Sequence, residues 1–137
     1  MQQAEDFRAE SEALFALLES QNPDTFSEST LFKDWTTNAV LQHLYVWNMM
    51  AGLQITDETE LVNRINKVFA HEKGMRGFEN DILDGLSGRA LLDAWIADVQ
   101  KTADLFADVD PKQRLKWAGP EMSARSSITA RLMETWA

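Results

Sequence analysis

Two histidines are the side chains of this sequence best suited to hold a metal ion or move a proton near neutral pH. His43 shares a helical face with Val40, Leu44 and Trp47, so we expect its imidazole to point inwards. Two roles remain open for His43: a core histidine bonded to a carbonyl or carboxylate, or a metal ligand with partners from another helix. His71 lies at an expected helix end, and we predict that it is a solvated residue there.

Glu134 is the acidic residue most suited to partner His43. It lies among apolar neighbours that include Leu132 and Trp136, where a carboxylate is costly unless a cation or a metal pairs with it. Arg131, three residues earlier, offers the alternative of an ordinary surface ion pair. Metal sites in helix bundles often take a glutamate and a histidine one turn apart on one helix. The position one turn after Glu134 would fall just beyond Ala137, and we therefore expect the last helix to continue past that residue.

Composition narrows the functions that the chain can perform. The 137 residues carry 13 basic and 22 acidic side chains, and this net charge of −9 argues against nucleic-acid and anionic-membrane partners. The sequence contains no cysteine, so any thiol chemistry needs a bound small molecule. Neither a signal peptide nor a long apolar run is present, and we expect a soluble, cytoplasmic protein.

The helices that carry these residues can be predicted from the spacing of apolar side chains along the sequence. This helical periodicity predicts four principal helices, near residues 3–20, 38–53, 88–107 and 123–137, with a further helical excursion at 57–84. No segment alternates apolar and polar residues over the length of a strand. We therefore expect an all-α protein: a single domain, 1–137, folded as an up-and-down four-helix bundle with a long helical crossover between the second and third helices.

The same periodicity predicts which large side chains are buried. Trp47 and Trp95 lie on the faces of their helices that are expected to form the core. The three other tryptophans could instead lie at the rim of a pocket: Trp35, Trp117 and Trp136. Several further hydrophobic residues are expected to face inwards or to tuck under the bundle: Leu17, Phe26, Leu31, Phe32, Phe69 and Met75.

Four segments together resemble a known family. They are FKDWT at 32–36, VLQHL at 40–44, WAGPEMS at 117–123 and RLMETWA at 131–137. This combination is similar to the metal-binding domain of the mycothiol-dependent maleylpyruvate isomerase family, which belongs to the DinB-like superfamily of four-helix bundles. The likeness covers essentially the whole chain, and it is more specific for the superfamily than for any one reaction.

The resemblance implies a divalent metal ion, zinc by preference, held by a histidine of the second helix and by a glutamate and a histidine of the last. His43 and Glu134 match two of these ligands, and the third is expected just beyond Ala137. In the family the ion activates a low-molecular-weight thiol such as mycothiol for isomerase or S-transferase chemistry on an electrophilic small molecule. Arg131 would assist an anionic group. With two of three ligands, the present chain is expected to bind metal weakly and to be inactive on its own.

A function of another class also fits a helical bundle of this kind. The chain could be a non-catalytic interaction module that meets a partner, or a second copy of itself as a homodimer, through apolar surface near its last helix.

Overall fold

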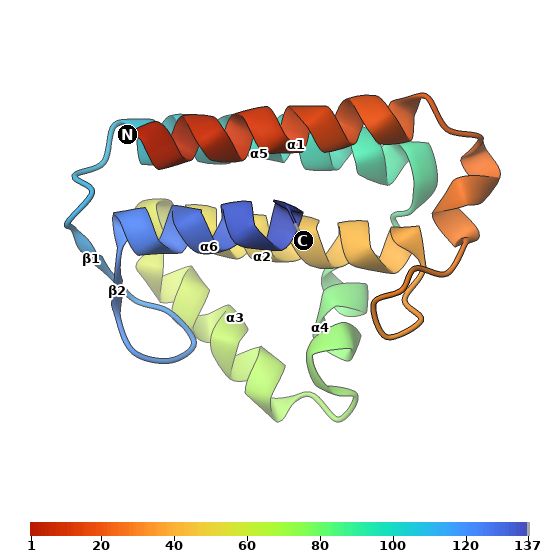
Figure 1. Ribbon diagram of the computed structural model, residues 1–137. Coiled ribbons are helices and arrows are strands. Elements are labelled where there is room, and N and C mark those ends of the chain that lie inside the picture. The colour runs from red at the N-terminus through yellow and green to blue at the C-terminus, as the bar shows by residue number, and fades with distance from the viewer. Residues whose placement is uncertain (137) are drawn as a thin grey trace.

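Four long helices form the body of the protein, and the computed structural model describes residues 1–136 of it (Figure 1). They are α1 (Gln2–Glu19), α2 (Thr37–Thr56), α5 (Gly88–Ala107) and α6 (Ala124–Trp136). Each lies within a few residues of its predicted position. The all-α helical bundle expected from the sequence is confirmed.

Contacts between the helices define their relative directions. Met1 donates its terminal N–H to the carbonyl of Ala107, and Arg8 contacts Asp104, so α1 and α5 run antiparallel. The Asn38 side chain accepts from the backbone N–H of Gly88 at the starts of α2 and α5, and these two helices therefore run side by side in the same direction. Because α2 and α5 run in the same direction, a long connection must bring the chain from the end of α2 back to the start of α5.

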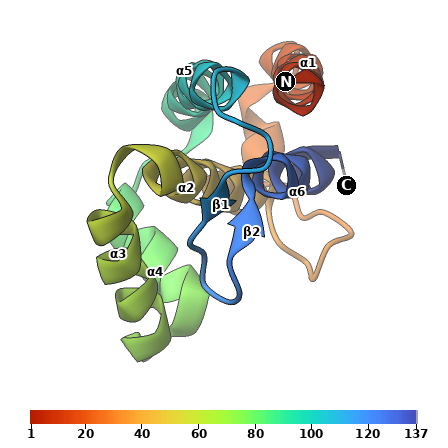
Figure 2. The ribbon, with the colours of Figure 1, turned by 90° about the vertical axis from the view of Figure 1, so that its left-hand side faces the viewer.

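The crossover between α2 and α5 consists of two shorter helices, α3 (Glu58–Ala70) and α4 (Gly74–Leu83). Both pack against α2 and lie below the four long helices in these views (Figures 1 and 2). Asp57 caps α3 by accepting from the N–H of Glu60 at 3.1 Å. Gly77 allows the turn before α4 to pass close to the helix, since a Cβ there would lie 2.4 Å from the His71 ring.

The start of α2 follows the sequence prediction closely. Thr36 accepts from the N–H of Ala39 at 3.1 Å and so caps the helix that carries His43. Before it, a short 3-10 helix (Pro23–Ser27) holds Phe26 in the core, as expected.

Two apolar clusters hold the elements together. The larger lies between α1, α2, α5 and α6 and includes Phe7, Trp95 and Phe106, while the smaller joins α2 to the crossover through Trp47, Leu61 and other residues. The expected burial of Trp47 and Trp95 is confirmed.

Several predicted inward positions are wrong. The following side chains are exposed: Leu17, Leu31, Phe32, Phe69 and Met75. Leu31 is exposed because its loop protrudes from the bundle. Phe69 lies on the solvent side of α3, whereas Val68 in the same turn packs against the smaller apolar cluster. Periodicity describes one helix at a time and cannot indicate where its neighbours end.

A small two-stranded antiparallel sheet precedes α6. β1 (Arg114–Leu115) pairs with β2 (Met122–Ser123), and the loop between them carries Trp117. None of the helices within residues 1–136 is long and apolar enough to cross a membrane.

Candidate functional site

His43 lies in the second turn of α2, between carboxylates that come from two other helices. Its Nδ1 is 2.7 Å from Oε2 of Glu79 in α4, and its Nε2 is 3.4 Å from Oε2 of Glu134 in α6. The side chain is 20 % exposed, so the expected inward orientation is largely confirmed. Because an ionised carboxylate only accepts hydrogen bonds, contact with Glu79 places a hydrogen on Nδ1.

Glu79 is completely buried, and three side chains donate to it. Besides His43, Trp47 donates Nε1–H to Oε2 at 2.9 Å, and Arg76 donates to Oε1 at 2.5 Å. Burial favours the neutral acid, but the hydrogen bonds from His43, Trp47 and Arg76 together outweigh burial and lower the pKa of Glu79 below its ordinary value. The carboxylate is thus held ionised inside the protein.

Arg76 and Gln42 extend this network on the side away from Glu134. Arg76 donates to the side-chain oxygen of Gln42 at 3.0 Å, and Gln42 donates to the carbonyl of Leu86 at 2.9 Å. The Arg76 guanidinium also stacks over the ring of Trp35 at 5.0 Å. Every member of the network therefore has a second contact that fixes its position.

Glu134 has the two neighbours that the sequence left as alternatives. Arg131 donates to its Oε2 at 3.0 Å, in addition to the approach of His43 Nε2. Arg131 itself is 5 % exposed and lies 5.7 Å over the ring of Trp117, so this pair is not an ordinary surface ion pair. Burial raises the pKa of Glu134, but the contacts with His43 and Arg131 outweigh burial and lower the pKa below its ordinary value.

The two carboxylates change the protonation of His43. Burial lowers the pKa of the imidazole, but the bonds to Glu134 and Glu79 and their charges raise it to about 9. In the metal-free protein at neutral pH, the ring is therefore an imidazolium between two anions.

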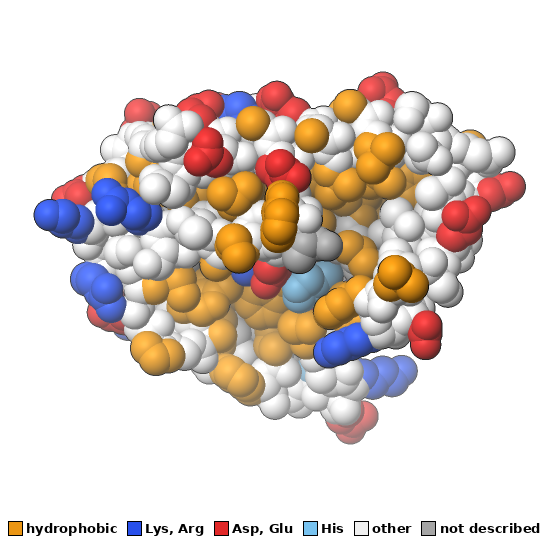
Figure 3. Space-filling model, in the orientation of Figure 1, with side chains coloured by type: hydrophobic (Ala, Val, Ile, Leu, Met, Phe, Trp, Pro, Cys, Tyr) orange, Lys and Arg blue, Asp and Glu red, His pale blue; other side chains and the backbone are white. Residues whose placement is uncertain are grey.

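Aromatic rings surround the imidazole. Trp35 lies 5.7 Å from the His43 ring and Trp47 lies 6.2 Å from it, while Trp117 lies 5.6 Å from Trp47. Trp136, the third tryptophan considered for a pocket rim, is 70 % exposed. Below α6, a histidine side chain sits in a hollow lined by hydrophobic groups (Figure 3).

The spacing of His43 and Glu134 fits a bridging metal ion. A tetrahedral zinc ion with bonds of about 2.1 Å separates two of its ligand atoms by about 3.4 Å, the separation found between Nε2 and Oε2. Glu79 on Nδ1 is the kind of outer carboxylate that orients metal-binding histidines. Within residues 1–136, however, no group of three or more histidine or acidic side chains is arranged to hold an ion. The expected third ligand lies outside the described residues.

His71 and Glu79 show what could and could not be predicted from the sequence. His71, just after α3, contacts Asp81 in the last turn of α4 at 2.7 Å and takes no part in the site. Glu79 was missed, because an acidic residue on a short, glycine-containing helix looks like a solvent-facing one. Its position next to Phe78, which is also buried, is the only local indication that it faces inwards.

Comparisons with known proteins bear on the family of this chain. A family model, the mycothiol maleylpyruvate isomerase N-terminal domain, matches residues 7–137. Two uncharacterized proteins of Mycobacterium tuberculosis, from strains CDC 1551/Oshkosh and H37Rv, are each 33 % identical over 132 residues. The match covers 96 % of this chain and 51 % of each relative, so the chain spans about half the length of the curated relatives it matches. No solved structure matches. The chain belongs to the family of mycothiol maleylpyruvate isomerase N-terminal domains.

Proposed function

We propose that this domain holds a divalent metal ion, zinc by preference, through Nε2 of His43 and the carboxylate of Glu134, and that it supports mycothiol-type thiol-dependent isomerase or transferase chemistry. The observation that carries the proposal is the pairing at His43: one ring nitrogen is fixed by a buried carboxylate and the other faces a second carboxylate at 3.4 Å. Membership in a mycothiol-associated family supports the proposed use of a low-molecular-weight thiol.

Glu79 would act as the positioning residue of this site. By accepting from Nδ1–H at 2.7 Å, it keeps the hydrogen on Nδ1 and prevents rotation of the ring, so that Nε2 is the nitrogen that binds a metal ion once its own proton is released. Its own position is fixed by Trp47 and Arg76. The cost of a buried carboxylate is therefore offset by three donors, and the imidazole is held in one orientation before anything binds.

Arg131 would control the charge of Glu134. Its guanidinium keeps the carboxylate ionised and ready to act as a ligand, and its stacking on Trp117 holds it at the edge of the hollow. From there it could also pair with an anionic group of a thiol or of an electrophilic substrate. A bound divalent ion would lower the pKa of a thiol and so present a thiolate at neutral pH, which a chain without cysteine cannot supply itself.

The aromatic rings would provide the apolar wall of the substrate site. Trp35 and Trp47 lie beside the imidazole, and Trp117 packs on Trp47. Such a wall excludes water from a thiolate and favours a small, partly apolar electrophile over a highly charged one.

Exposed apolar residues favour a second candidate, the non-catalytic interaction module. Phe32, Met133 and Trp136 are each more than half exposed, and all are large. Association through them, including homodimer formation, would be seen as a concentration-dependent mass in analytical ultracentrifugation. A strict monomer that binds one metal ion per chain would contradict this alternative.

Metal titration tests the main proposal. We expect calorimetry with zinc to show one weak site in the chain, because only two protein ligands are available. His43→Gln should abolish the binding, and Glu134→Gln should weaken it at least ten-fold. His71→Gln is the matched control, since it removes the only other histidine and should leave binding unchanged. Equal loss in the His43 and His71 variants, or no loss in the first, would refute the proposed site.

A further inference from the structure

Gln42, the residue before His43, ties α2 to the crossover at two points. Its Nε2 donates to the carbonyl of Leu86 at 2.9 Å, and its Oε1 accepts from Arg76 at 3.0 Å. Leu86 lies in the turn between α4 and α5, whereas Arg76 lies in the first turn of α4. One amide therefore bonds to the chain both before and after Glu79, the residue of α4 that contacts the imidazole.

Arg76 connects Gln42 to the carboxylate that holds the imidazole. Its Nη2 donates to Gln42, and its Nη1 donates to Oε1 of Glu79 at 2.5 Å. Because the guanidinium is planar and rigid, fixing one of its nitrogens fixes the direction of the other. His43 and Trp47 both contact the other oxygen of Glu79, Oε2. Arg76 therefore determines how the carboxylate is rotated, and with it where Oε2 meets the imidazole.

The bond to Gln42 limits the movement of an arginine that water can reach. Arg76 is 29 % exposed and contacts Glu79 from three residues away on the same helix, an arrangement that is weak when it stands alone. Trp35 holds the face of the guanidinium at 5.0 Å but does not fix its rotation in the plane. The amide oxygen of Gln42 supplies that second, directional contact.

Asn38, one turn before Gln42 on α2, separates two roles that Gln42 combines. Its Oδ1 accepts from the N–H of Gly88 at 2.8 Å, so it anchors the start of α5 beside the same turn. This bond involves neither Arg76 nor Glu79. Loss of Asn38 would therefore loosen the connection between α4 and α5, whereas loss of Gln42 would also release the guanidinium.

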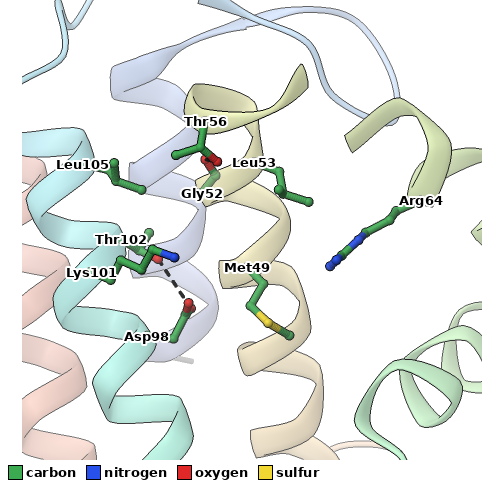
Figure 4. A pocket seen from close by; sticks show the side chains of 9 residues that line it. All are labelled: Met49, Gly52, Leu53, Thr56, Arg64, Asp98, Lys101, Thr102 and Leu105. Atoms are coloured by element: carbon green, nitrogen blue, oxygen red, sulfur yellow. Dashed lines mark hydrogen bonds between the residues drawn. The ribbon is translucent and has the colours of Figure 1, made fainter. Parts of the chain in front are cut away.

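The second half of α2 faces the crossover in a different way. A cavity of about 200 Å³ opens there between α2, α3 and α5, and Met49 and Leu53 of α2 line it (Figure 4). The hydrogen bond drawn in this cavity, from Thr102 to Asp98, lies within α5 and ties α2 to nothing. Gln42 thus lies in the half of α2 from which polar side chains reach α4.

We propose that Gln42 is a positioning residue of the candidate site: it holds Arg76, and Arg76 orients the carboxylate that fixes the His43 ring. The functional meaning of this role rests on the proposed metal binding by His43, but the chain of contacts can be measured without a metal. If Gln42 only anchored the turn at Leu86, its loss would act as the loss of Asn38 does. Because it acts through Arg76, its loss reaches the imidazole.

Exchange of the His43 Nδ1 hydrogen with water, measured by nuclear magnetic resonance in the metal-free chain, tests this role. A hydrogen in a 2.7 Å bond to a buried carboxylate should resonate downfield and exchange slowly. Gln42→Ala should speed the exchange about ten-fold, which corresponds to the loss of one hydrogen bond of ordinary strength. Asn38→Ala is the matched control and should leave the exchange rate unchanged.

Zinc affinity and a double substitution give two further measurements. Competition with a chromophoric chelator should show about ten-fold weaker zinc binding for Gln42→Ala and unchanged binding for Asn38→Ala. In an Arg76→Ala background, Gln42→Ala should change neither the exchange rate nor the affinity any further, because its effect passes through the guanidinium. Circular dichroism establishes that each variant is folded.

Equal acceleration of exchange in the Gln42 and Asn38 variants would overturn the proposed role. So would additive effects of the Gln42 and Arg76 substitutions, or an Nδ1 hydrogen that already exchanges rapidly in the wild-type chain. Failure of the metal site has a different signature: zinc binding would not depend on His43, while Gln42→Ala would still speed the exchange. That result would contradict the proposed function and support the role of Gln42.

Discussion

Replacing Asp98 by asparagine should stabilise the protein at neutral pH, by an amount that follows from its burial. Burial raises the pKa of this carboxyl from 3.8 to about 6, against the effects of Lys101 and of the Thr102 hydrogen bond. A difference of about two pH units, at about 1.4 kcal/mol per unit, corresponds to about 3 kcal/mol. This free energy is the penalty for ionising the group in the folded chain. Asparagine has nearly the same shape and cannot ionise, so it removes the penalty.

The sign of the pH dependence follows from the direction of the shift. Between pH 3.8 and 6 the folded state binds more protons at Asp98 than the unfolded state does, so stability falls as the pH rises through this range. The advantage of Asp98→Asn should therefore be near zero below pH 4 and complete above pH 6.5. Burial and the charge of Asp98 raise the pKa of Tyr45 above its ordinary value, so this phenol stays neutral throughout that range.

Urea unfolding at a series of pH values measures this difference. We expect the free energies of unfolding of Asp98→Asn and wild type to agree at pH 3 and to differ by about 3 kcal/mol at pH 7.5 in favour of the variant. Asp93→Asn, on the exposed side of the same helix, should show no such pH-dependent gain. A destabilised Asp98→Asn at pH 7.5, or a gain independent of pH, would refute the reasoning.

The other predictions concern the core and the site. Glu79→Gln should cost about 3 kcal/mol, because it removes the charge from a buried, paired carboxylate, whereas Asp81→Asn in the exposed pair with His71 should cost less than about 0.5 kcal/mol. Phe106→Ala should cost about 4 kcal/mol, and Leu31→Ala almost nothing, because Phe106 is fully buried and Leu31 is fully exposed. Nuclear magnetic resonance titration should place the pKa of His43 near 9. Protonation of His43 then stabilises the fold fully below pH 6.5, and this contribution is lost as the pH rises through 9.

Each of these predictions has an outcome that contradicts it. Equal losses in the Glu79 and Asp81 variants would mean that burial adds nothing to the first pair. A small loss for Phe106→Ala would show that the larger apolar cluster is not a single packed core. A His43 pKa near 6.5 would mean that the two carboxylates do not act on the ring as their distances indicate.

The four long helices could be predicted because their signals are local. Thr36 as a cap and the periodic apolar positions of α2 and α5 lie within a few residues of the boundaries that they determine. Burial at the ends of elements could not be predicted in the same way. Phe69 fits the apolar period of α3, yet it is 72 % exposed, whereas its neighbour Val68 packs against the smaller apolar cluster.

The candidate site likewise contains residues that could be predicted from the sequence and residues that could not. His43 and Glu134 were proposed as partners from helical spacing and from the family resemblance, and the structure places Nε2 and Oε2 3.4 Å apart. The role of Glu79 could not be predicted, because it depends on how the crossover folds back against α2. Asp98 was also missed, since nothing in its local sequence distinguishes it from the exposed Asp93 on the same helix.

The crossover that supplies Glu79 has a consequence for any transfer of this chemistry to another protein. A minimal scaffold with only α1, α2, α5 and α6 would reproduce His43 and Glu134 but would leave Nδ1 without its acceptor. Insertions or deletions in residues 57–84 would likewise alter the imidazole's orientation while sparing the body of the fold. The same constraint therefore applies to protein design and to natural sequence change. Residues 57–84 look like a spacer, but their length must be kept for the imidazole to keep its orientation.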